Sequence, residues 1–132
     1  MKDAVEILRE HLITSGNGLY TLNAGRVWFQ DLPDGFTNTQ SAIVLTVANE
    51  SSEMNGAMIK LTVNMRVYGG TNQKLTTRTL YRALVDRLHN QHGSNADGSI
   101  IRARVVQGIM SADPATDWPV MIVTANVTIE GY

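Results

Sequence analysis

The sequence predicts an α+β fold with two layers, in which two helices pack on one face of a mostly antiparallel or mixed β-sheet. The prediction depends on a change of hydrophobic period within residues 57–90. Residues 59–67 alternate apolar and polar side chains, which is typical of a strand with one buried face. After Gly69 and Gly70, residues 75–88 place apolar side chains every three or four positions, as an amphipathic helix does. One apolar helix face and one apolar sheet face favour a two-layer domain.

The strand and the helix of this central segment each carry a continuous apolar face. The strand face consists of Ile59, Leu61, Val63, Met65 and Val67. The helix arc consists of Leu80, Tyr81, Leu84, Val85 and Leu88. Thr76 or Thr77 is expected to cap the helix, because a hydroxyl at that position accepts a hydrogen bond from an unpaired helical amide. Gly69 and Gly70 are expected to form the preceding turn, since glycine adopts positive φ without strain.

The other predicted elements lie on both sides of this segment and give the order α-β-β-β-α-β-β. A first helix is predicted over residues 2–13, because four apolar side chains share one arc: Ala4, Val5, Leu8 and Leu12. Further strands are predicted over residues 26–32, 42–49, 100–107 and 120–130. Residues 19–25 fit either a short strand or a linker. All of these elements belong to a single domain that covers residues 1–132.

Loops and turns separate the predicted strands. Pro33-Asp34-Gly35 predicts a turn, since proline fixes φ and glycine accepts the left-handed conformation. The strands at 42–49 and 59–67 are expected to form an antiparallel hairpin with a wide loop. That loop, Glu50–Gly56, is polar and is expected to project from the body of the domain. A second polar loop is expected over residues 91–99.

The composition excludes several classes of protein. The chain has 132 residues, of which 43% are hydrophobic and 17% charged, so it is globular rather than disordered. It has no cysteine, which excludes disulfides, thiolate metal sites and a cysteine nucleophile and fits assembly in a reducing cytoplasm. The N-terminal residues carry acids and lack a long apolar run, so we expect no signal peptide. No apolar run is long enough to predict a membrane-spanning helix.

The charges are unevenly distributed, although the net charge is only −1. Residues 57–107 contain eight basic and two acidic residues, and the rest of the chain contains three basic and ten acidic ones. One explanation is two solvated faces of opposite sign. The other is a subunit with a positive and a negative side, suited to head-to-tail contacts. Nucleic acid is a weaker candidate partner, because no basic run is interleaved with aromatic residues and the isoelectric point is only about 6.3.

Histidine pairs can hold metals, and His89 and His92 are spaced three residues apart at the end of the second predicted helix. A zinc site needs a third and a fourth ligand, and no acid stands at a supporting spacing. Histidine is also common at helix C-termini, where its charge complements the helix dipole. His11 lies within the apolar arc of the first helix and is expected to be packed and hydrogen-bonded. The sequence therefore predicts no metal site.

Paired carboxylates are the other candidate for catalysis. Asp113 and Asp117 flank Pro114, but acids beside proline usually stabilise turns with their own side chains. No nucleophile elbow, phosphate-binding loop or dinucleotide-binding fingerprint is present in the sequence. We therefore predict no catalytic site, no cofactor and no enzymatic activity. The prominent polar loops and long strands favour an assembly subunit, since long exposed strands need a partner surface.

The order and spacing of the elements resemble the tail terminator (tail completion) proteins of tailed bacteriophages. The resemblance covers most of the chain and combines a short N-terminal helix with strands and turns in a fixed order. Its segments are Arg26-Val27-Trp28 running into Leu32-Pro33, the strands at 42–47 and 59–67, the helix Leu75–Leu88 after a glycine turn, and two closing strands around Asp117-Trp118-Pro119.

The resemblance implies a small structural subunit without a catalytic site. Such subunits form a ring, usually of six copies, on the head-proximal end of the tail tube. The ring stops tube growth and presents the surface that docks to the head connector. The implied partners are other copies of the chain, the tail tube protein and the head–tail connector protein, with DNA only as cargo passing through the ring. The implied location is the virion, after assembly in the host cytoplasm, with no membrane involved.

Two hypotheses about interfaces follow from the charges and the loops. The basic helix residues Arg78 and Arg82 are expected to meet an acidic surface of the neighbouring subunit. The candidate acids are Glu6, Glu10 and Asp31. The Glu50–Gly56 loop is expected to reach toward the tube or the head partner through Glu50, Glu53, Met54 and Asn55.

Two alternative functions remain open at this stage. One is another phage neck or tail component, such as a connector or a tube protein. The other is a small metabolite-binding or catalytic α+β domain that uses His89, His92 or Asp117.

Overall fold

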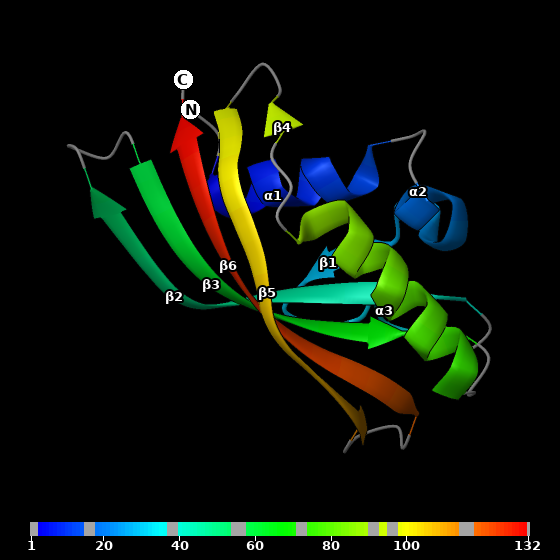
Figure 1. Ribbon diagram of the computed structural model, residues 1–132. Helices are drawn as coiled ribbons and strands as arrows, with labels where there is room; N and C mark the ends of the chain where they lie inside the picture. The colour runs from blue at the N-terminus through cyan, green and yellow to red at the C-terminus, as the bar shows by residue number, and fades with distance from the viewer. Residues whose placement is uncertain are drawn as a thin grey trace.

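The computed structural model confirms the α+β fold, with helices packed on one face of a six-stranded mixed sheet (Figure 1). It describes residues 3–14, 18–36, 40–53, 58–70, 74–89, 93–94, 98–113 and 118–131. The elements in chain order are α1 (Ala4–Ile13), α2 (Gly18–Asn23), β1 (Val27–Phe29), β2 (Ala42–Glu53), β3 (Met58–Tyr68), α3 (Lys74–Leu88), β4 (Gly93–Ser94), β5 (Gly98–Ala112) and β6 (Pro119–Gly131).

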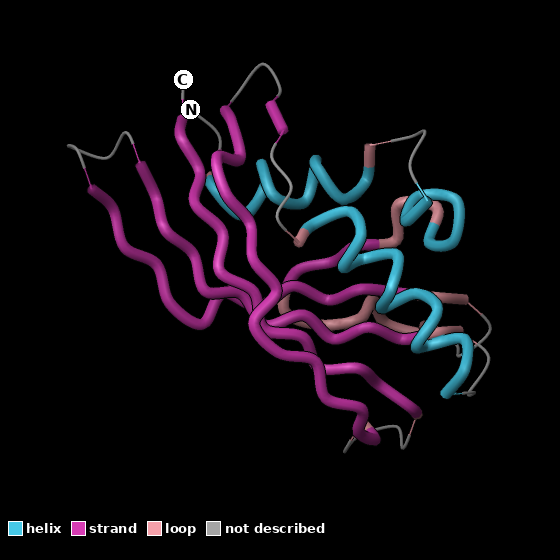
Figure 2. Tube along the Cα trace, viewed as in Figure 1, coloured by secondary structure: helices cyan, strands magenta, loops and turns pink. Residues whose placement is uncertain are grey.

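The sheet has the strand order β1-β2-β3-β6-β5-β4. β1 runs parallel to β2, and all other neighbouring strands are antiparallel. Four long strands, β2, β3, β6 and β5, form the body of the sheet, while β1 and β4 are short (Figure 2). The predicted hairpin of residues 42–49 and 59–67 is confirmed by the β2–β3 pairing.

The long strands bend together near their middle, as Figure 1 shows. β2 has a bulge between Val47 and Asn49, and β5 has one between Val105 and Gln107. Both bulges lie on the same row of the sheet, because Val47 pairs with Val63, Val63 with Ala125, and Ala125 with Val105. A bulge bends its strand and increases the local twist. Two bulges on one row therefore account for the common bend.

The main core lies between the sheet and the helices α1 and α3. The predicted strand face is buried there, with Leu61, Val63, Met65 and Val67 at most 2% exposed. The helices contribute buried leucines: Leu8, Leu12, Leu80, Leu84 and Leu88. Each fully buried leucine stabilises the fold by about 1.5–3 kcal/mol relative to an exposed one. The period change in the sequence thus corresponds to the main core of the domain.

A second, smaller cluster lies on the opposite face of the sheet, which we call the outer face. It consists of buried Ala42, Val44, Tyr68 and Val120, with Trp28, Leu32, Phe36 and Trp118 packed against them. The rings of Trp28 and Phe36 meet edge to face at 5.5 Å, and those of Tyr68 and Trp118 do so at 6.3 Å. This cluster attaches the β1–β2 connection to the sheet.

Two turn predictions are confirmed. The Phe36 amide donates to the Pro33 carbonyl at 3.1 Å, and Gly35 has a φ of 74°, as a turn at Pro33-Asp34-Gly35 requires. Gly70 has a φ of 92° between β3 and α3. Gly69 has a different role, since a Cβ there would lie 2.7 Å from the Thr76 carbonyl carbon. The turn needs one glycine for its backbone conformation and the other for close packing against α3.

The predicted helix cap at Thr76 or Thr77 is wrong, because α3 already begins at Lys74. Thr77 is buried inside the helix, and its hydroxyl accepts a hydrogen bond from the Gly69 amide at 3.2 Å. The hydroxyl therefore binds the incoming turn.

Residues 19–25 form neither a strand nor a linker, since most of them belong to α2. Leu19 and Asn23 are buried one helical turn apart. The side-chain Nδ2 of Asn23 donates to the Arg26 carbonyl at 2.9 Å, and the Ser41 hydroxyl donates to Asn23 Oδ1 at 3.0 Å. A helix this short depends on such tertiary contacts, which the local sequence pattern does not show.

Several strand boundaries also differ from the prediction. β1 covers only 27–29 of the predicted 26–32, because Gln30 has a positive φ of 68° that ends the strand. β2 continues to Glu53, so the first half of the predicted Glu50–Gly56 loop is strand. β5 extends from Gly98 to Ala112, and β4 lies within the predicted 91–99 loop. The polar residues 50–53 thus extend β2 beyond its predicted end, and residues 98–99 and 108–112 extend β5 at its two ends.

Candidate interaction surfaces

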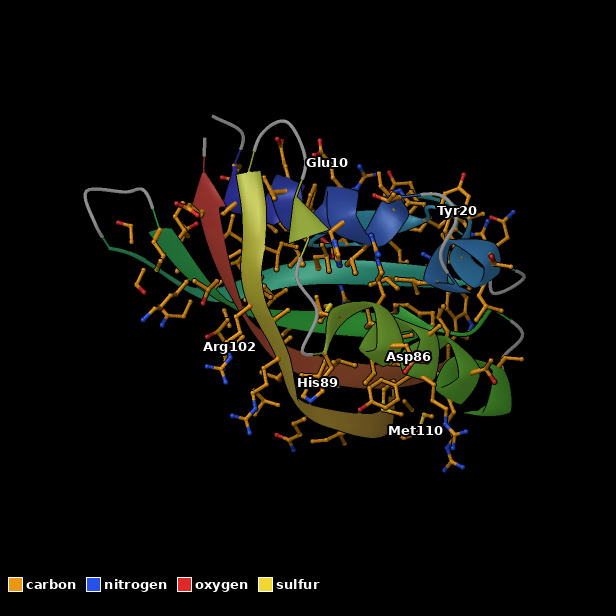
Figure 3. All side chains as sticks on the ribbon, turned by 45° about the horizontal axis from the view of Figure 1, so that its top comes forward. Glu10, Tyr20, Asp86, His89, Arg102 and Met110 are labelled. Carbon is orange, nitrogen blue, oxygen red and sulfur yellow. The ribbon has the colours of Figure 1, made fainter. Side chains whose placement is uncertain are left out.

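Several histidines and aspartates were considered as metal ligands or catalytic groups. Those that the structure describes make structural contacts. The Val105 amide donates to His89 Nδ1 at 2.9 Å, so this nitrogen is occupied at the end of α3 beside β5 (Figure 3). His92 and Asp117 lie outside the described residues. Within the described part of the chain, no three His, Asp or Glu side chains are grouped closely enough to hold a metal ion.

Asp113 connects the end of β5 to the outer-face cluster. It is 7% exposed, and the Tyr68 hydroxyl donates to its Oδ2 at 2.5 Å. Burial and then the hydrogen bond to Asp113 raise the pKa of the Tyr68 phenol. The backbone amide of Asp113 donates to the Trp118 carbonyl at 2.9 Å. These contacts give Asp113 a structural role, and the sequence prediction missed its partner Tyr68.

The predicted basic surface is present on α3. Arg78 and Arg82 are exposed and stand one turn apart, so the helix places them on the same side. They lie on the part of α3 that points away from its buried leucines. The structure therefore brings these two predicted interface residues together.

The predicted acidic residues are divided between several elements. Glu6 is exposed and Glu10 half-buried, one turn apart on α1. Asp31 follows β1 and lies 3.7 Å from Arg66 of the same chain, as an ion pair with an Asp31 side chain that is 91% exposed. An exposed ion pair of this kind contributes about 0–1 kcal/mol, so Asp31 stays available to other cations.

The predicted loop residues occupy a different place from the one expected. Glu50 is exposed on β2, where it pairs with Leu61 of β3, rather than on a projecting loop. Glu53 is the last residue of β2, and its side chain is not described. Met54 and Asn55 lie outside the described residues. The hypothesis of a long projecting loop is therefore wrong for Glu50–Glu53, which belong to a sheet edge.

The two sides of the four-stranded body have unpaired segments among the described residues. On β2, β1 pairs only with Ile43–Leu45, so residues 46–53 have a described partner on one side only. On β5, β4 pairs only with Ser99 and Ile100, so residues 106–112 likewise pair only with β6. The sequence analysis missed these edges, since strand neighbours are not visible in a local pattern.

Exposed apolar side chains gather at the same places. Val106 and Ile109 of β5 are 55% and 50% exposed, and Ile109 pairs with the exposed Ile122 of β6. Phe29 and Val47 are exposed on the β1–β2 side. Single exposed apolar residues are normal, but groups of them beside unpaired strands mark interaction surfaces. In the sequence, Val106 directly follows the apolar Val105, and Ile109 lies beyond the predicted strand end at Gln107; these two irregularities are the signal that could have revealed them.

Polar and basic side chains cover the outer face beyond the aromatic cluster. Lys60 pairs with Thr128, which pairs with Arg102, and the next row continues through Thr62, Asn126 and Arg104. The Thr62 hydroxyl donates to Asn126 Oδ1 at 3.1 Å. Figure 3 shows Arg102 projecting from β5 on the side away from α3. The unequal charge distribution of the sequence thus places basic residues on β5 and on α3.

Comparison with known proteins identifies the fold. No protein-family description matches the sequence, and no curated protein is similar to it. A chain of a solved structure, the "Virion of native gene transfer agent (GTA) particle", matches with a TM-score of 0.69 and 15% identity, over 99% of this chain and 100% of that chain. Among the described residues, no helix has the length and apolarity needed to cross a membrane. The match shows that this chain shares its complete fold with a chain of that particle.

Proposed function

We propose that the chain is a structural component of a phage-like virion, and specifically the subunit that terminates the tail tube. In this role, copies of the chain form a ring on the head-proximal end of the tube, end its polymerisation and provide the surface that docks to the head. The observation that carries the proposal is the shared fold over the full length of both chains with a chain of a gene transfer agent virion. The order of elements that resembles the tail terminator proteins points to the same function.

The surfaces of the molecule support an assembly role. Among the described residues, strand segments 46–53 and 106–112 each pair on one side only and lie on opposite sides of the sheet, and exposed apolar side chains stand beside both. Arg78 and Arg82 form a basic surface on α3, whereas Glu6 and Glu10 form an acidic one on α1. Surfaces of opposite sign on one subunit favour heterologous contacts, which form a ring when the rotation between copies closes. The expected partners are further copies, the tail tube protein and the head connector, and DNA passes through the ring.

Deletion of the coding segment from the producing genome tests this function. Without a terminator, tube polymerisation has no stop, so we expect tails of abnormal and variable length together with unattached heads. Expression of the intact chain from a second locus should restore attached tails of uniform length. Electron microscopy of the particles measures both properties.

The outcome also separates the proposal from its alternatives. Unattached tails of normal, uniform length would assign the chain to a connector of the neck instead. Normal, attached tails in the deletion strain would overturn a structural role in the virion. Mass spectrometry of purified wild-type particles provides an independent check, because a terminator ring stays in the finished virion.

A further inference from the structure

We propose that copies of this chain join edge to edge, with residues 46–53 of β2 in one copy pairing with residues 106–112 of β5 in the next. This inference deepens the proposed function, since it names the surface that closes the ring. It rests on four observations: the two unpaired segments, the strand directions, the side chains at the two edges, and the offset between the segments along the strands.

The strand directions make such a joint antiparallel. The four long strands β2, β3, β6 and β5 alternate in direction across the sheet. β2 and β5 therefore run in opposite directions within one copy. A rotation about a ring axis along the strands preserves these directions, so β5 of the next copy runs antiparallel to β2. The alternation continues without interruption from copy to copy, and the joint gains a ladder of backbone hydrogen bonds.

The side chains favour pairing of unlike edges. β5 carries the exposed Arg102 and Arg104 and has no acid between 102 and 112. The β2 segment has the exposed Glu50 and no base. A two-fold dimer through β5 would bring two edges of the same positive sign together, whereas a joint between β5 and β2 brings edges of unlike sign together. Pairing β5 with β2 also covers the exposed Val106 and Ile109.

The offset of the two segments fits the geometry of a closed sheet. Val47 and Val105 lie on one row across the sheet. The β2 segment extends mainly to one side of this row along the strands and the β5 segment to the other, so that their centres are about five residues apart. Strands of closed barrels tilt by about 35–45° from the axis. Four strands about 4.8 Å apart then advance by about 13–19 Å, or about four to six residues, from one copy to the next. The offset between the two segments therefore agrees in size with the step that a tilted ring requires.

This register sets Ser51 of one copy opposite Ile109 of the next, both on the outer face of the sheet. Directly opposed residues of antiparallel strands have Cα atoms about 4.5–5.5 Å apart, which a disulfide can span. The chain has no cysteine, so introduced thiols report only the designed contact. The test uses the single variants Ser51→Cys and Ile109→Cys, each alone and mixed, in the full-length protein under mild oxidation.

The mixture should give a covalent dimer that reducing agent returns to monomer, while neither single variant links to itself. The double variant Ser51→Cys/Ile109→Cys should give a ladder of covalent oligomers. Its matched control combines Ser51→Cys with Asn126→Cys, an exposed residue on the interior strand β6, and should remain monomeric on a non-reducing gel. Combining Ser51→Cys with Gln107→Cys or with Ser111→Cys, in place of Ile109→Cys, tests a register shifted by two residues.

Several outcomes would overturn the inference. Linking of either single variant to itself would show a two-fold contact, and equal linking through position 126 would show random collision. Rings seen by electron microscopy without any link between position 51 and positions 107–111 would refute this interface but leave the proposed function intact. Absence of any oligomer, alone or with tail tubes added, would contradict both.

Discussion

His11 and Arg87 each bind the backbone carbonyl of the other and so join the ends of α1 and α3. His11 Nε2 donates to the Arg87 carbonyl at 3.1 Å, and Arg87 Nε donates to the His11 carbonyl at 2.9 Å. Both carbonyls lie in the last turn of their helix, where no helical amide is available. Burial lowers the pKa of both side chains. The predicted packed and hydrogen-bonded role of His11 is confirmed.

Removing either partner should destabilise the fold. His11→Ala and Arg87→Ala should each lower the free energy of unfolding by about 1–3 kcal/mol, because a half-buried carbonyl loses its donor. The double variant should lose less than the sum, since the two side chains share one contact region. Urea unfolding measures all three values. Arg82→Ala on the exposed face of α3 is the control, and strict additivity of the two losses would contradict the pairing.

The same contact makes stability depend on pH. The pKa of His11 in the folded state is below its usual value of 6.5, mainly because of burial, so the unfolded chain takes up a proton more readily. The contribution of His11 is therefore complete above pH 6.5 and is lost as the pH falls from there through the lowered folded pKa. His11→Gln should reduce the loss of melting temperature between pH 7.5 and pH 5.5. An unchanged pH profile would assign the dependence to other groups.

The contact between Tyr68 and Asp113 should be among the strongest polar contacts of the outer face. Tyr68→Phe should lower the free energy of unfolding by about 1.5–3 kcal/mol, the range for hydrogen bonds to charged groups. Asp113→Asn should cost less, since the amide oxygen still accepts from the phenol. Chemical denaturation compares the two variants. A loss below about 0.5 kcal/mol in Tyr68→Phe would show that solvent replaces the contact.

Gly69→Ala tests the close approach of the β3–α3 turn. The new Cβ would lie 2.7 Å from the Thr76 carbonyl carbon, so the helix start has to move. We expect a loss of about 1–3 kcal/mol in the free energy of unfolding, as for overpacked sites. Gly18→Ala is the matched control, because no atom lies within 4 Å of the added carbon. Equal stability of the two variants would show that the turn relaxes without cost.

The charged surfaces of α3 and α1 provide a test of subunit contact. The charge reversal Arg78→Glu with Arg82→Glu should weaken ring formation, most strongly at low salt, where screening is least. If Glu6 and Glu10 are the partners, adding Glu6→Lys and Glu10→Lys should restore assembly. Restoration by Asp31→Lys instead would assign the contact to Asp31. Assembly that is unchanged by the first reversal at every ionic strength would exclude α3 from the interface.

The sequence predicted those parts of the fold that depend on local period. The alternation of residues 59–67 and the arc from Leu80 to Leu88 determine the main core; most of their apolar side chains are buried as expected, while Ile59, Tyr81 and Val85 are partly buried. The short helix α2 was missed because its stability comes from contacts with Ser41 and Arg26 rather than from its own six residues. β2 was predicted too short because Glu50–Glu53 become strand through pairing with β3, and a run of polar residues does not indicate such pairing.

The candidate surfaces were predicted less completely than the fold. Arg78 and Arg82 do share an exposed helix face, since helical spacing alone determines this. The edges at 46–53 and 106–112, which pair on one side only within the described part of the chain, could not be predicted, because they depend on which strands become neighbours in space. Charge counts indicated a subunit with unlike sides, and the structure places basic side chains on α3 and β5 and the acidic pair Glu6 and Glu10 on α1.

Electron microscopy of the purified chain over a concentration series, alone and with tail tubes added, tests the central claim most directly. The account predicts closed rings with a central hole, either free in solution or seated on one end of the tube. Particles that stay single or form only two-fold dimers under both conditions would contradict it.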